Sequence, residues 1–278
     1  VSIVSMIIGF LGKGGSGKTT LASGFALFLS KNSSVLAIDA DHNMDMTYNL
    51  AKNELPTYIG AGLSDINKHL GITQYRDSFD SIKMPEFTLS PEDAITKKYA
   101  HKVTLSLKVM STGPHTDEIL YDKACSHSLA TPLKVYLPFL NLKENEYVVV
   151  DEKAGTDGVG TGITTGFHAA VVVAEPTPYG LKAALQIIKL LNFYKTPYFT
   201  ALNKVASDED ILFAEKYLDR KLDLIFFSDQ EALRFSEKTV SIFNEQFNQL
   251  KDKLEKISDT RLDRTKEKIK RNTQYSEQ

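Results

Sequence analysis

A glycine-rich stretch near the start of the chain has the residue types that bind phosphate groups. Residues 12–20 read GKGGSGKTT and match the pattern G-x-x-x-x-G-K-[ST]. Backbone amides of such a loop, with the positive end of the helix after it, surround phosphate oxygens. Lys18 would contact the β- and γ-phosphates, and the Thr19 hydroxyl would be a ligand of Mg²⁺. A nucleoside triphosphate, or its diphosphate product, is therefore predicted to bind at Gly12, Gly14, Gly15, Ser16, Gly17, Lys18, Thr19 and Thr20.

The segments on either side of the loop have the character that this pattern needs. The apolar run Met6–Leu11 predicts a buried strand before the loop, and Thr19–Ser30 is compatible with a helix after it. A glycine-rich turn that binds nothing is the alternative. The agreement of motif and flanking elements favours the phosphate site.

Carboxylates follow two other apolar runs. Asp39 ends the run Ser34–Asp39 and Asp41 comes two residues later, while Asp151 follows the run Tyr147–Val150. Phosphoryl transfer needs a positioned water, a metal ion and cations, but no covalent nucleophile. An acid at the end of a strand such as Tyr147–Val150 is typical of a Walker B motif, so Asp151 is predicted to hold Mg²⁺ through water.

A second lysine in the loop narrows the class of protein. Lys13 gives the loop the form K-G-G-x-G-K-T-T, which resembles the deviant Walker A of the MinD/ParA/ArsA/nitrogenase iron-protein (SIMIBI) superfamily of P-loop ATPases. The resemblance covers the first fifty residues and the stretch from about Tyr147 to Lys204. It implies ATP as the nucleotide and a nucleotide-dependent homodimer in which Lys13 reaches the partner's nucleotide. There Lys13 would stabilise charge on the transferred phosphoryl group, as an arginine finger does. A solvated loop lysine is the alternative.

The same resemblance implies roles for four other residues. Asp41 would orient or deprotonate the attacking water, so that Lys13, Lys18 and Asp41 form the catalytic set. Asp39 would support the Mg²⁺ shell with Thr19 and Asp151. Gly155, the glycine of D-x-x-x-G, would meet the γ-phosphate through its amide, and Asn203 would contact adenine. Simple turn formation is the alternative role for Asp41 and for Asn203.

Two segments resemble the CooC branch, the ATPases that help insert nickel into carbon monoxide dehydrogenase. Residues 38–43 read IDADHN and residues 151–155 read DEKAG, close to that branch's I-D-A-D-x-N and D-x-E-A-G. The branch also has a C-x-C pair, with which two subunits bind a metal ion. In place of this C-x-C pair, this chain has Cys125, Ser126 and His127, so that a histidine stands where the second cysteine would be. Two C-x-H pairs in a dimer would suit Zn²⁺, and Ni²⁺ less well. A small buried cysteine is the alternative.

Composition and charge favour some classes of protein over others. The chain has 278 residues, 42% of them hydrophobic and 24% charged, which is enough for one large α/β domain. A formal net charge of −2 gives no strong sign of a nucleic-acid partner. No apolar run approaches the roughly 18 residues of a membrane span. The one cysteine allows no intrachain disulfide, and a cytoplasmic location is expected.

Apolar runs alternate with helix-length segments in the rest of the chain. This alternation predicts an α/β fold with a doubly wound, mostly parallel sheet flanked by helices. The later strands are expected at Tyr147–Val150, Ala169–Ala174, Tyr198–Leu202 and Leu222–Phe227, and helices at Tyr179–Asn192 and Asp208–Leu222. Residues 1–228 would be the P-loop domain. Its middle, 55–146, is hard to interpret, although the alternating run Val103–Val109 predicts one strand.

Residues 229–278 are predicted to form a helical C-terminal extension. One apolar stripe runs along it with spacings of 4, 3, 4 and 3: Phe243, Phe247, Leu250, Leu254 and Ile257. We expect this stripe to dock on the sheet of its own chain, and a dimer contact or a membrane surface is the alternative. The mixed charges of residues 251–278 are expected to face solvent.

These features together predict a Mg²⁺-dependent ATPase with slow turnover. It would act as a nucleotide-driven dimerisation switch, with a metalloenzyme or metal centre as its client. A positioning ATPase of the MinD/ParA type on membrane or DNA is one alternative, and a nucleotide-sensing scaffold that does not hydrolyse ATP is another. DNA would require a basic surface and membrane a short basic amphipathic tail, and neither stands out in this sequence.

Overall fold

Strands from both halves of the chain form one mixed sheet. The computed structural model describes residues 5–72, 89–122, 126–232 and 234–276. Within these ranges the sheet has eight strands in the order β3-β4-β2-β5-β1-β6-β7-β8. Their bounds are β1 Met6–Gly12, β2 Ser34–Asp39, β3 Ala100–Lys102, β4 Leu107–Ser111, β5 Glu146–Asp151, β6 Ala169–Ala174, β7 Tyr198–Val205 and β8 Leu224–Phe227.

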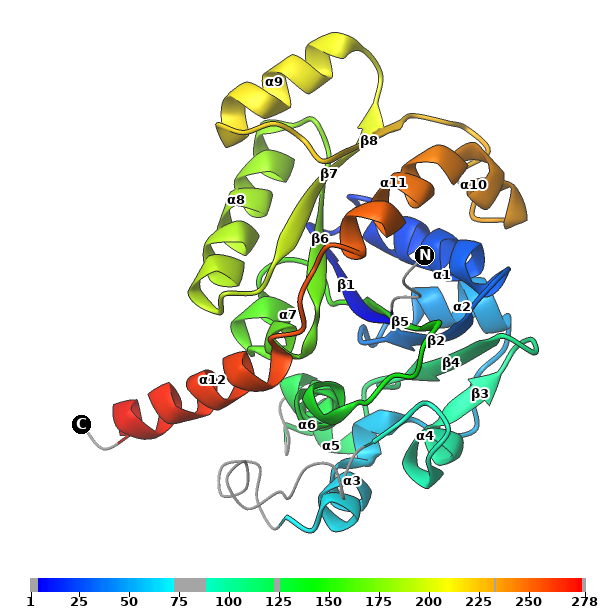
Figure 1. Ribbon diagram of the computed structural model, residues 1–278, viewed down its shortest axis with the longest axis vertical. Coiled ribbons are helices and arrows are strands. Elements are labelled where there is room, and N and C mark those ends of the chain that lie inside the picture. Colours follow the sequence, from blue (N-terminus) through cyan, green and yellow to red (C-terminus); the bar gives the residue numbers. More distant parts are fainter. Residues whose placement is uncertain (1–4, 73–88, 123–125, 233, 277–278) are drawn as a thin grey trace.

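The helices cover both faces of this sheet (Figure 1). Their bounds are α1 Lys18–Ser30, α2 Asp45–Ala51, α3 Leu63–Leu70, α4 Ala94–Tyr99, α5 Asp117–Leu120, α6 Thr131–Phe139, α7 Asp157–Gly160, α8 Pro178–Phe193, α9 Asp208–Leu218, α10 Glu237–Ile242, α11 Asn244–Leu254 and α12 Arg261–Ser276. Three short 3₁₀ helices are η1 Ile59–Ala61, η2 Ser126–Ala130 and η3 Ile163–Gly166. Side chains of α1, α2 and α11 share one apolar core, and those of α3, α6, α8, α9 and α12 share another.

All described strand pairs are parallel except β3 with β4. The three central strands β2, β5 and β1 are apolar over nearly their whole length, because both faces of a parallel sheet are covered. Pairing of β2 with β5 sets Asp39 opposite Asp151. The predicted doubly wound, mostly parallel fold is confirmed, and it brings the acids at the carboxyl ends of these strands to one edge.

The apolar stripe of the C-terminal extension docks on its own chain, as expected. Phe247 is fully buried, and its ring lies 5.7 Å from those of Phe25 and Phe28 in α1. Gly24 permits this contact, since a Cβ there would lie 2.9 Å from the Phe247 ring. Helix α11 therefore covers α1, the helix that follows the glycine-rich loop.

The charged end of the chain is placed differently from the prediction. Four basic side chains of α12 lie at spacings of 3, 4 and 3 and turn toward the body of the protein: Arg261, Arg264, Lys268 and Arg271. They donate hydrogen bonds to backbone carbonyls at or beside the ends of α6, η3 and α8. Carbonyls at helix ends lack partners within their helix and attract cations. The expectation that this segment faces solvent is thus wrong for its basic stripe, since only the other side of α12 is exposed.

The middle of the chain contributes to the sheet and the core. The predicted strand Val103–Val109 is partly wrong: residues 103–106 form the turn between β3 and β4, and Leu105 at this turn is 93% exposed. Alternation alone cannot separate a strand from a tight turn between two strands. Helix α6 lies fully in the core through Leu133, Tyr136 and neighbouring residues.

Candidate functional site

The glycine-rich loop joins β1 to α1 and has the backbone that its sequence predicts. Gly17 has a φ of 89°, a left-handed value that favours glycine, and α1 begins directly after it. A Cβ at Gly17 would lie 2.2 Å from the Asn203 amide nitrogen. The loop therefore packs against the end of β7, and this contact leaves no room for a side chain at Gly17.

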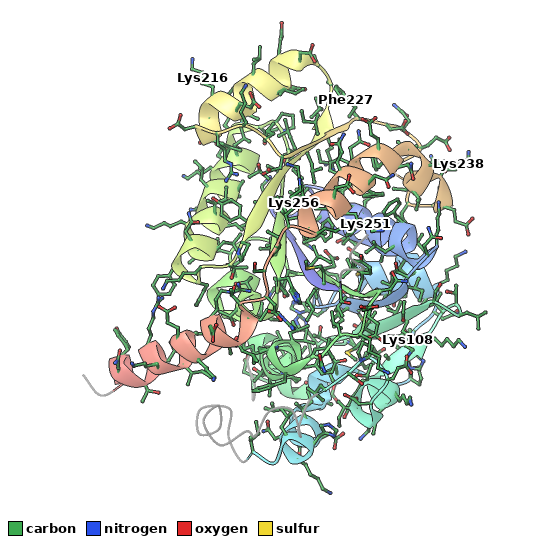
Figure 2. All side chains as sticks on the ribbon, viewed as in Figure 1. Lys108, Lys216, Phe227, Lys238, Lys251 and Lys256 are labelled. Carbon is green, nitrogen blue, oxygen red and sulfur yellow. The ribbon has the colours of Figure 1, made fainter. Side chains whose placement is uncertain are left out.

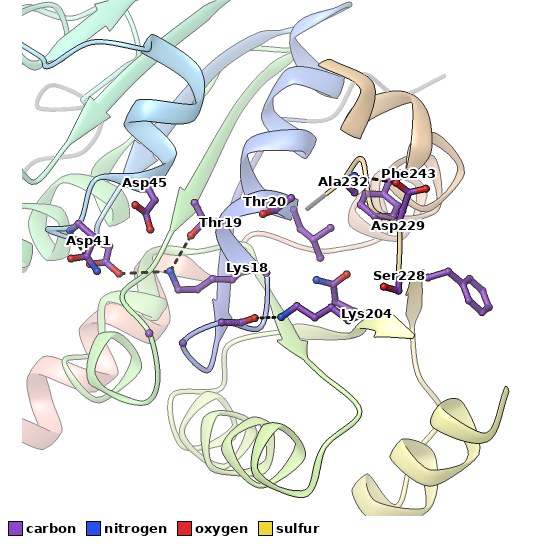
Figure 3. A pocket seen from close by; sticks show the side chains of 18 residues that line it. Lys18, Thr19, Thr20, Asp41, Asp45, Lys204, Ser228, Asp229, Ala232 and Phe243 are labelled. Atoms are coloured by element: carbon purple, nitrogen blue, oxygen red, sulfur yellow. Dashed lines mark hydrogen bonds and ion pairs between the residues drawn. The ribbon is translucent and has the colours of Figure 1, made fainter. Parts of the chain in front are cut away.

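Lys18, Thr19 and two acids meet at the start of α1. The Lys18 ammonium lies 3.3 Å from Asp151 Oδ1 and 3.8 Å from Asp41 Oδ2. The Thr19 hydroxyl donates a hydrogen bond of 2.6 Å to Asp151 Oδ2. Figure 3 shows Lys18 reaching toward Thr19 and Asp41 across the cleft. The structure thus brings Asp41 and Asp151, from two distant segments, to the neighbouring residues Lys18 and Thr19.

Asp39 holds the loop after β2 from within. It is fully buried, and it accepts hydrogen bonds from the Thr47 amide (2.8 Å), the Thr47 hydroxyl (3.0 Å) and the Asp41 amide (3.2 Å). These bonds fix the backbone of Asp41 relative to β2. Asp39 therefore positions Asp41, which lines the cleft, while Asp39 itself does not line it.

Burial dominates the electrostatics of these groups. It raises the pKa of Asp39 to about 7, and the neighbouring Asp151 carboxylate adds to this effect. Burial also raises the pKa of Asp151 and raises that of Glu152 to about 8. Burial alone would lower the pKa of Lys18, but attraction to Asp151 and Asp41 outweighs it, and the pKa is raised. Four acidic side chains therefore surround a single lysine at this site. This excess of acidic groups would favour binding of a cation such as a metal ion.

Lys13 lies at the other side of the loop with a different partner. Its ammonium is 3.3 Å from Glu175 Oε1, and its side chain is 43% exposed. Lys204 lies 3.6 Å from Glu175 Oε2 and donates a 2.5 Å hydrogen bond to the Gly15 carbonyl. Glu175 therefore holds two lysines beside the phosphate loop, and both keep access to solvent.

Two other predicted residues touch the loop through their amides. The Asn203 side chain donates a 2.8 Å hydrogen bond to the Ser16 carbonyl. The Gly155 amide donates a 2.8 Å hydrogen bond to the Gly12 carbonyl. The predicted contact between the Gly155 amide and a γ-phosphate would require the amide to release the Gly12 carbonyl.

A cleft of about 380 Å³ opens beside these residues, within the range of roughly 300–1,000 Å³ that ligand pockets occupy. Asp41 and Asp45 lie near one end, and Ser228, Asp229 and Phe243 near the other (Figure 3). The predicted residues that line it are Gly14, Gly15, Gly17, Lys18, Thr19, Thr20, Asp41 and Asn203. Asp39 and Asp151 lie beneath the cleft, where Asp151 contacts Lys18 and Thr19.

Several residues of this cleft are not among the predicted site residues. They are Leu21, Asn43, Asp45, Ala154, Lys204, Phe227, Ser228, Asp229, Ala232 and Phe243. Ser228 and Asp229 directly follow β8, so the rule that ligands bind at the carboxyl ends of parallel strands could have found them. The sequence predicts Phe243 only as part of the apolar stripe of the extension. Its place in the cleft depends on how that extension folds back.

The donor set at the start of α1 fits Mg²⁺. A hydroxyl and carboxylates are the hard oxygen ligands that this ion prefers, and in phosphate sites it takes only one or two protein ligands. Among the described residues, no group of three His, Cys, Asp or Glu side chains forms a metal cage. Cys125 lies outside the described residues, and only the backbone of His127, in η2, is described. The predicted Zn²⁺ or Ni²⁺ pair therefore stays a prediction.

The fold and this cleft agree with a comparison against protein families. A model of the CobQ/CobB/MinD/ParA nucleotide binding domain matches residues 7–272. The chain belongs to this family. The resemblance carried by Lys13 and the rest of the loop is thereby confirmed, and the chain is a nucleotide-binding P-loop protein of the MinD/ParA type.

The chain is also similar to individual curated proteins and solved structures. The chain is 24% identical over 257 residues to an ATP-binding protein of Methanocaldococcus jannaschii, covering 90% of this chain and 98% of that one. It is 29% identical over 213 residues to the carbon monoxide dehydrogenase accessory protein CooC of Rhodospirillum rubrum, covering 75% and 78%. The structure of MinD from Pyrococcus horikoshii with Mg-ADP superposes with a TM-score of 0.64 at 16% identity, covering 91% and 97%.

In the described part of the chain, every helix is too short or too polar to cross a bilayer.

Proposed function

We propose that this protein is a Mg²⁺-dependent ATPase that turns over slowly and dimerises according to its bound nucleotide. The cluster of Lys18, Thr19, Asp41 and Asp151 at the loop of a MinD/ParA-type domain carries the proposal. It combines a buried cation for phosphate oxygens with oxygen ligands for a metal ion. These are the parts that phosphoryl transfer to water needs.

Each residue has one task in the proposed reaction. Lys18 binds the β- and γ-phosphate oxygens. Thr19 and Asp151 would hold Mg²⁺, which would neutralise phosphate charge. Asp41, anchored through Asp39, orients a water molecule in line with the γ-phosphorus. The water oxygen bonds to phosphorus as the bond to the bridging oxygen of ADP breaks. The proton of the water passes to Asp41 and then to solvent.

Lys13 is the residue that we propose to act on a second subunit. Its ammonium lies at the loop and remains partly exposed, while its contact with Glu175 is a surface ion pair of small energy. A partner's nucleotide would offer Lys13 a phosphate anion in place of Glu175. Dimerisation would then complete the catalytic set only when nucleotide is present.

Asp41→Asn tests the enzyme, with turnover and mass measured on the same samples. With ATP and Mg²⁺, we expect the wild-type protein to form a dimer and hydrolyse ATP slowly. The variant should keep the ATP-dependent dimer and lose roughly 100-fold or more in turnover, because asparagine cannot accept the proton. Asp208→Asn, at the exposed start of α9 and outside the cleft, is the control and should change turnover by less than about threefold. No turnover in the wild type, even at high protein concentration, would leave the non-hydrolysing scaffold as the function.

A metal centre is the client that we propose for this switch. Support comes from the 29% identity to CooC, an accessory protein of carbon monoxide dehydrogenase. The test is native mass spectrometry with ATP, Mg²⁺ and limiting Zn²⁺ or Ni²⁺. One transition metal in the ATP-dependent dimer, absent in Cys125→Ser, is the expected result. A dimer without such a metal would send the search for clients to protein, DNA or membrane partners.

The formal net charge of −2 gives no reason to prefer DNA as a partner. The lysines labelled in Figure 2 come from β4, α9, α10, α11 and the residues just after α11. Nucleic-acid binding needs cations gathered on one surface. ATP-dependent DNA binding that weakens steeply with salt would contradict this choice and favour positioning on DNA.

A further inference from the structure

Glu152 directly follows Asp151, yet the mechanism above gives it no task. Its side chain is 1% exposed, and its Oε1 atom has no hydrogen-bond partner among the described residues. Its backbone amide donates to the Phe10 carbonyl, which fixes the residue at the end of β5. The protein therefore keeps an unpaired carboxyl oxygen in its interior, next to the acids of the cleft.

The surroundings of this carboxyl connect the two loops that border the phosphate site. One is the loop after β2, which carries Asp41, and the other is the segment after β5, which carries Gly155. A cavity of about 20 Å³ lies between them. Besides Glu152, residues of both loops line it, together with Leu129 and Ala130 of η2; those from the loops are Ala40, His42, Lys153, Asp157, Gly158 and Thr161.

The fit against α7 is close enough to hold the carboxyl in place. A Cβ at Gly158 would lie 2.4 Å from Glu152 Oε2, whereas a Cβ at Gly160 in the same helix would meet nothing within 4 Å. Gly158 is therefore the residue that makes room for the carboxyl. A buried acceptor without a donor destabilises a fold, and an apolar residue of the same size would avoid this cost. Such costs persist where a function needs them.

We propose that Glu152 is a positioning residue that couples the two loops: its free carboxyl oxygen gains a hydrogen-bond donor from the loop after β2 when nucleotide binds. The inference rests on the proposed function, because it makes the loop that carries Asp41 respond to the segment that carries Gly155. In the nucleotide-free protein the unpaired oxygen favours departure from the resting arrangement. Once paired, it favours the arrangement in which both loops close on the phosphates.

Glu152→Met tests this proposal with two measurements: the melting temperature without nucleotide and the change in hydrogen exchange with Mg-ADP. If Glu152 only supported the fold, the substitution would lower both. Without nucleotide, the melting temperature of the variant should rise by about 2–4 °C, because the unpaired oxygen is gone. With Mg-ADP, hydrogen exchange at residues 40–43 and 153–161 should slow in the wild type. In the variant this slowing should shrink roughly fivefold or more. Glu152→Gln keeps an acceptor oxygen and should retain most of the wild-type response.

Matched variants separate coupling from general disturbance. Thr164→Val removes a buried hydroxyl oxygen that, like the Glu152 carboxyl oxygen, has no partner among the described residues. Thr164 lies in η3, outside the cavity lining. It should leave the ADP response unchanged. Gly158→Ala should weaken the response as Glu152→Met does, because the added methyl displaces the carboxyl, and Gly160→Ala should not.

The outcomes distinguish this inference from the proposed function. A wild-type protein that shows the ADP response but neither turnover nor ATP-dependent dimerisation would overturn the function and leave the coupling testable. A Glu152→Met variant with the full ADP response would overturn the coupling. So would a variant that loses the response together with its nucleotide-free stability, since Glu152 would then only support the fold.

Discussion

Lys13 and Lys18 stand five residues apart in one loop and have different surroundings. Lys18 is buried among Asp41 and Asp151, and Lys13 pairs with Glu175 near solvent. A buried cation bonded to phosphate contributes far more binding energy than an exposed one, since water and salt screen the latter. The two lysines are therefore expected to serve different steps.

Substitution of each lysine by alanine separates these steps at the residue scale. Lys18→Ala should weaken Mg-ADP binding by about 10- to 150-fold, because charge-assisted hydrogen bonds contribute about 1.5–3 kcal/mol. Lys13→Ala should change that affinity less than about threefold and abolish ATP-dependent dimerisation or turnover. Isothermal titration with ADP and mass measurement with ATP check the two variants. Equal losses of ADP affinity would contradict a role for Lys13 across a dimer.

Helix α12 shows how a charged element can be part of the core at the scale of secondary structure. Its basic side chains satisfy carbonyls at the ends of other helices, and Arg264, which is 4% exposed, bonds to the Phe167 and Thr165 carbonyls beside η3. Burial lowers the pKa of Arg264 to about 10 and that of Lys268 to about 7. Because η3 follows α7 and the segment that carries Gly155, α12 braces the far end of that segment.

Removal of one member of the stripe should destabilise the whole protein. Arg264→Ala is expected to lower the free energy of unfolding by about 2–4 kcal/mol, since it leaves buried carbonyls unpaired and a cavity behind. Lys266→Ala, on the exposed side of the same helix, should stay within about 0.5 kcal/mol of the wild type. Urea unfolding of the three proteins measures the difference. Similar midpoints for both variants would show that the stripe does not hold α12.

At the scale of the whole molecule, His168 ties the sheet to the C-terminal extension. It is 4% exposed, its Nδ1 accepts a hydrogen bond from the Ile7 amide, and its Nε2 lies 3.5 Å from Asp259, just before α12. Burial lowers the pKa of His168, Arg261 and Arg264 lower it further, and Asp259 partly opposes them. The neutral ring is therefore the form that the fold prefers.

This preference predicts a loss of stability in mild acid. Above the ordinary histidine pKa of about 6.5 the ring is neutral in both the folded and unfolded protein, so its stabilising contribution is complete. As the pH falls below that value, the unfolded chain binds the proton first, and stability decreases toward the lower pKa of the folded state. Melting temperatures from pH 7.5 to 5.0 should therefore fall more steeply in the wild type than in His168→Gln. His115→Gln, at an exposed histidine, is the control and should follow the wild type.

The sequence by itself determined the parts of the molecule whose cause is local. The loop around Lys18 is predicted by its glycines and the helix that follows. The positions of buried strands along the chain are predicted by apolar runs, two of which end at or just before Asp39 and Asp151. The family followed from the same loop. These features could be predicted because each depends on residues that are neighbours in the chain.

Only the tertiary structure decided the contacts between distant segments. The turn at Leu105, the place of Phe243 in the cleft and the pairing of Lys13 with Glu175 depend on which elements lie side by side. The basic stripe of α12 is the clearest case, because its pattern equally fits a solvated face until carbonyls of other helices are brought to it. Glu152 is similar: only a packed interior distinguishes a carboxyl without a partner from one in water.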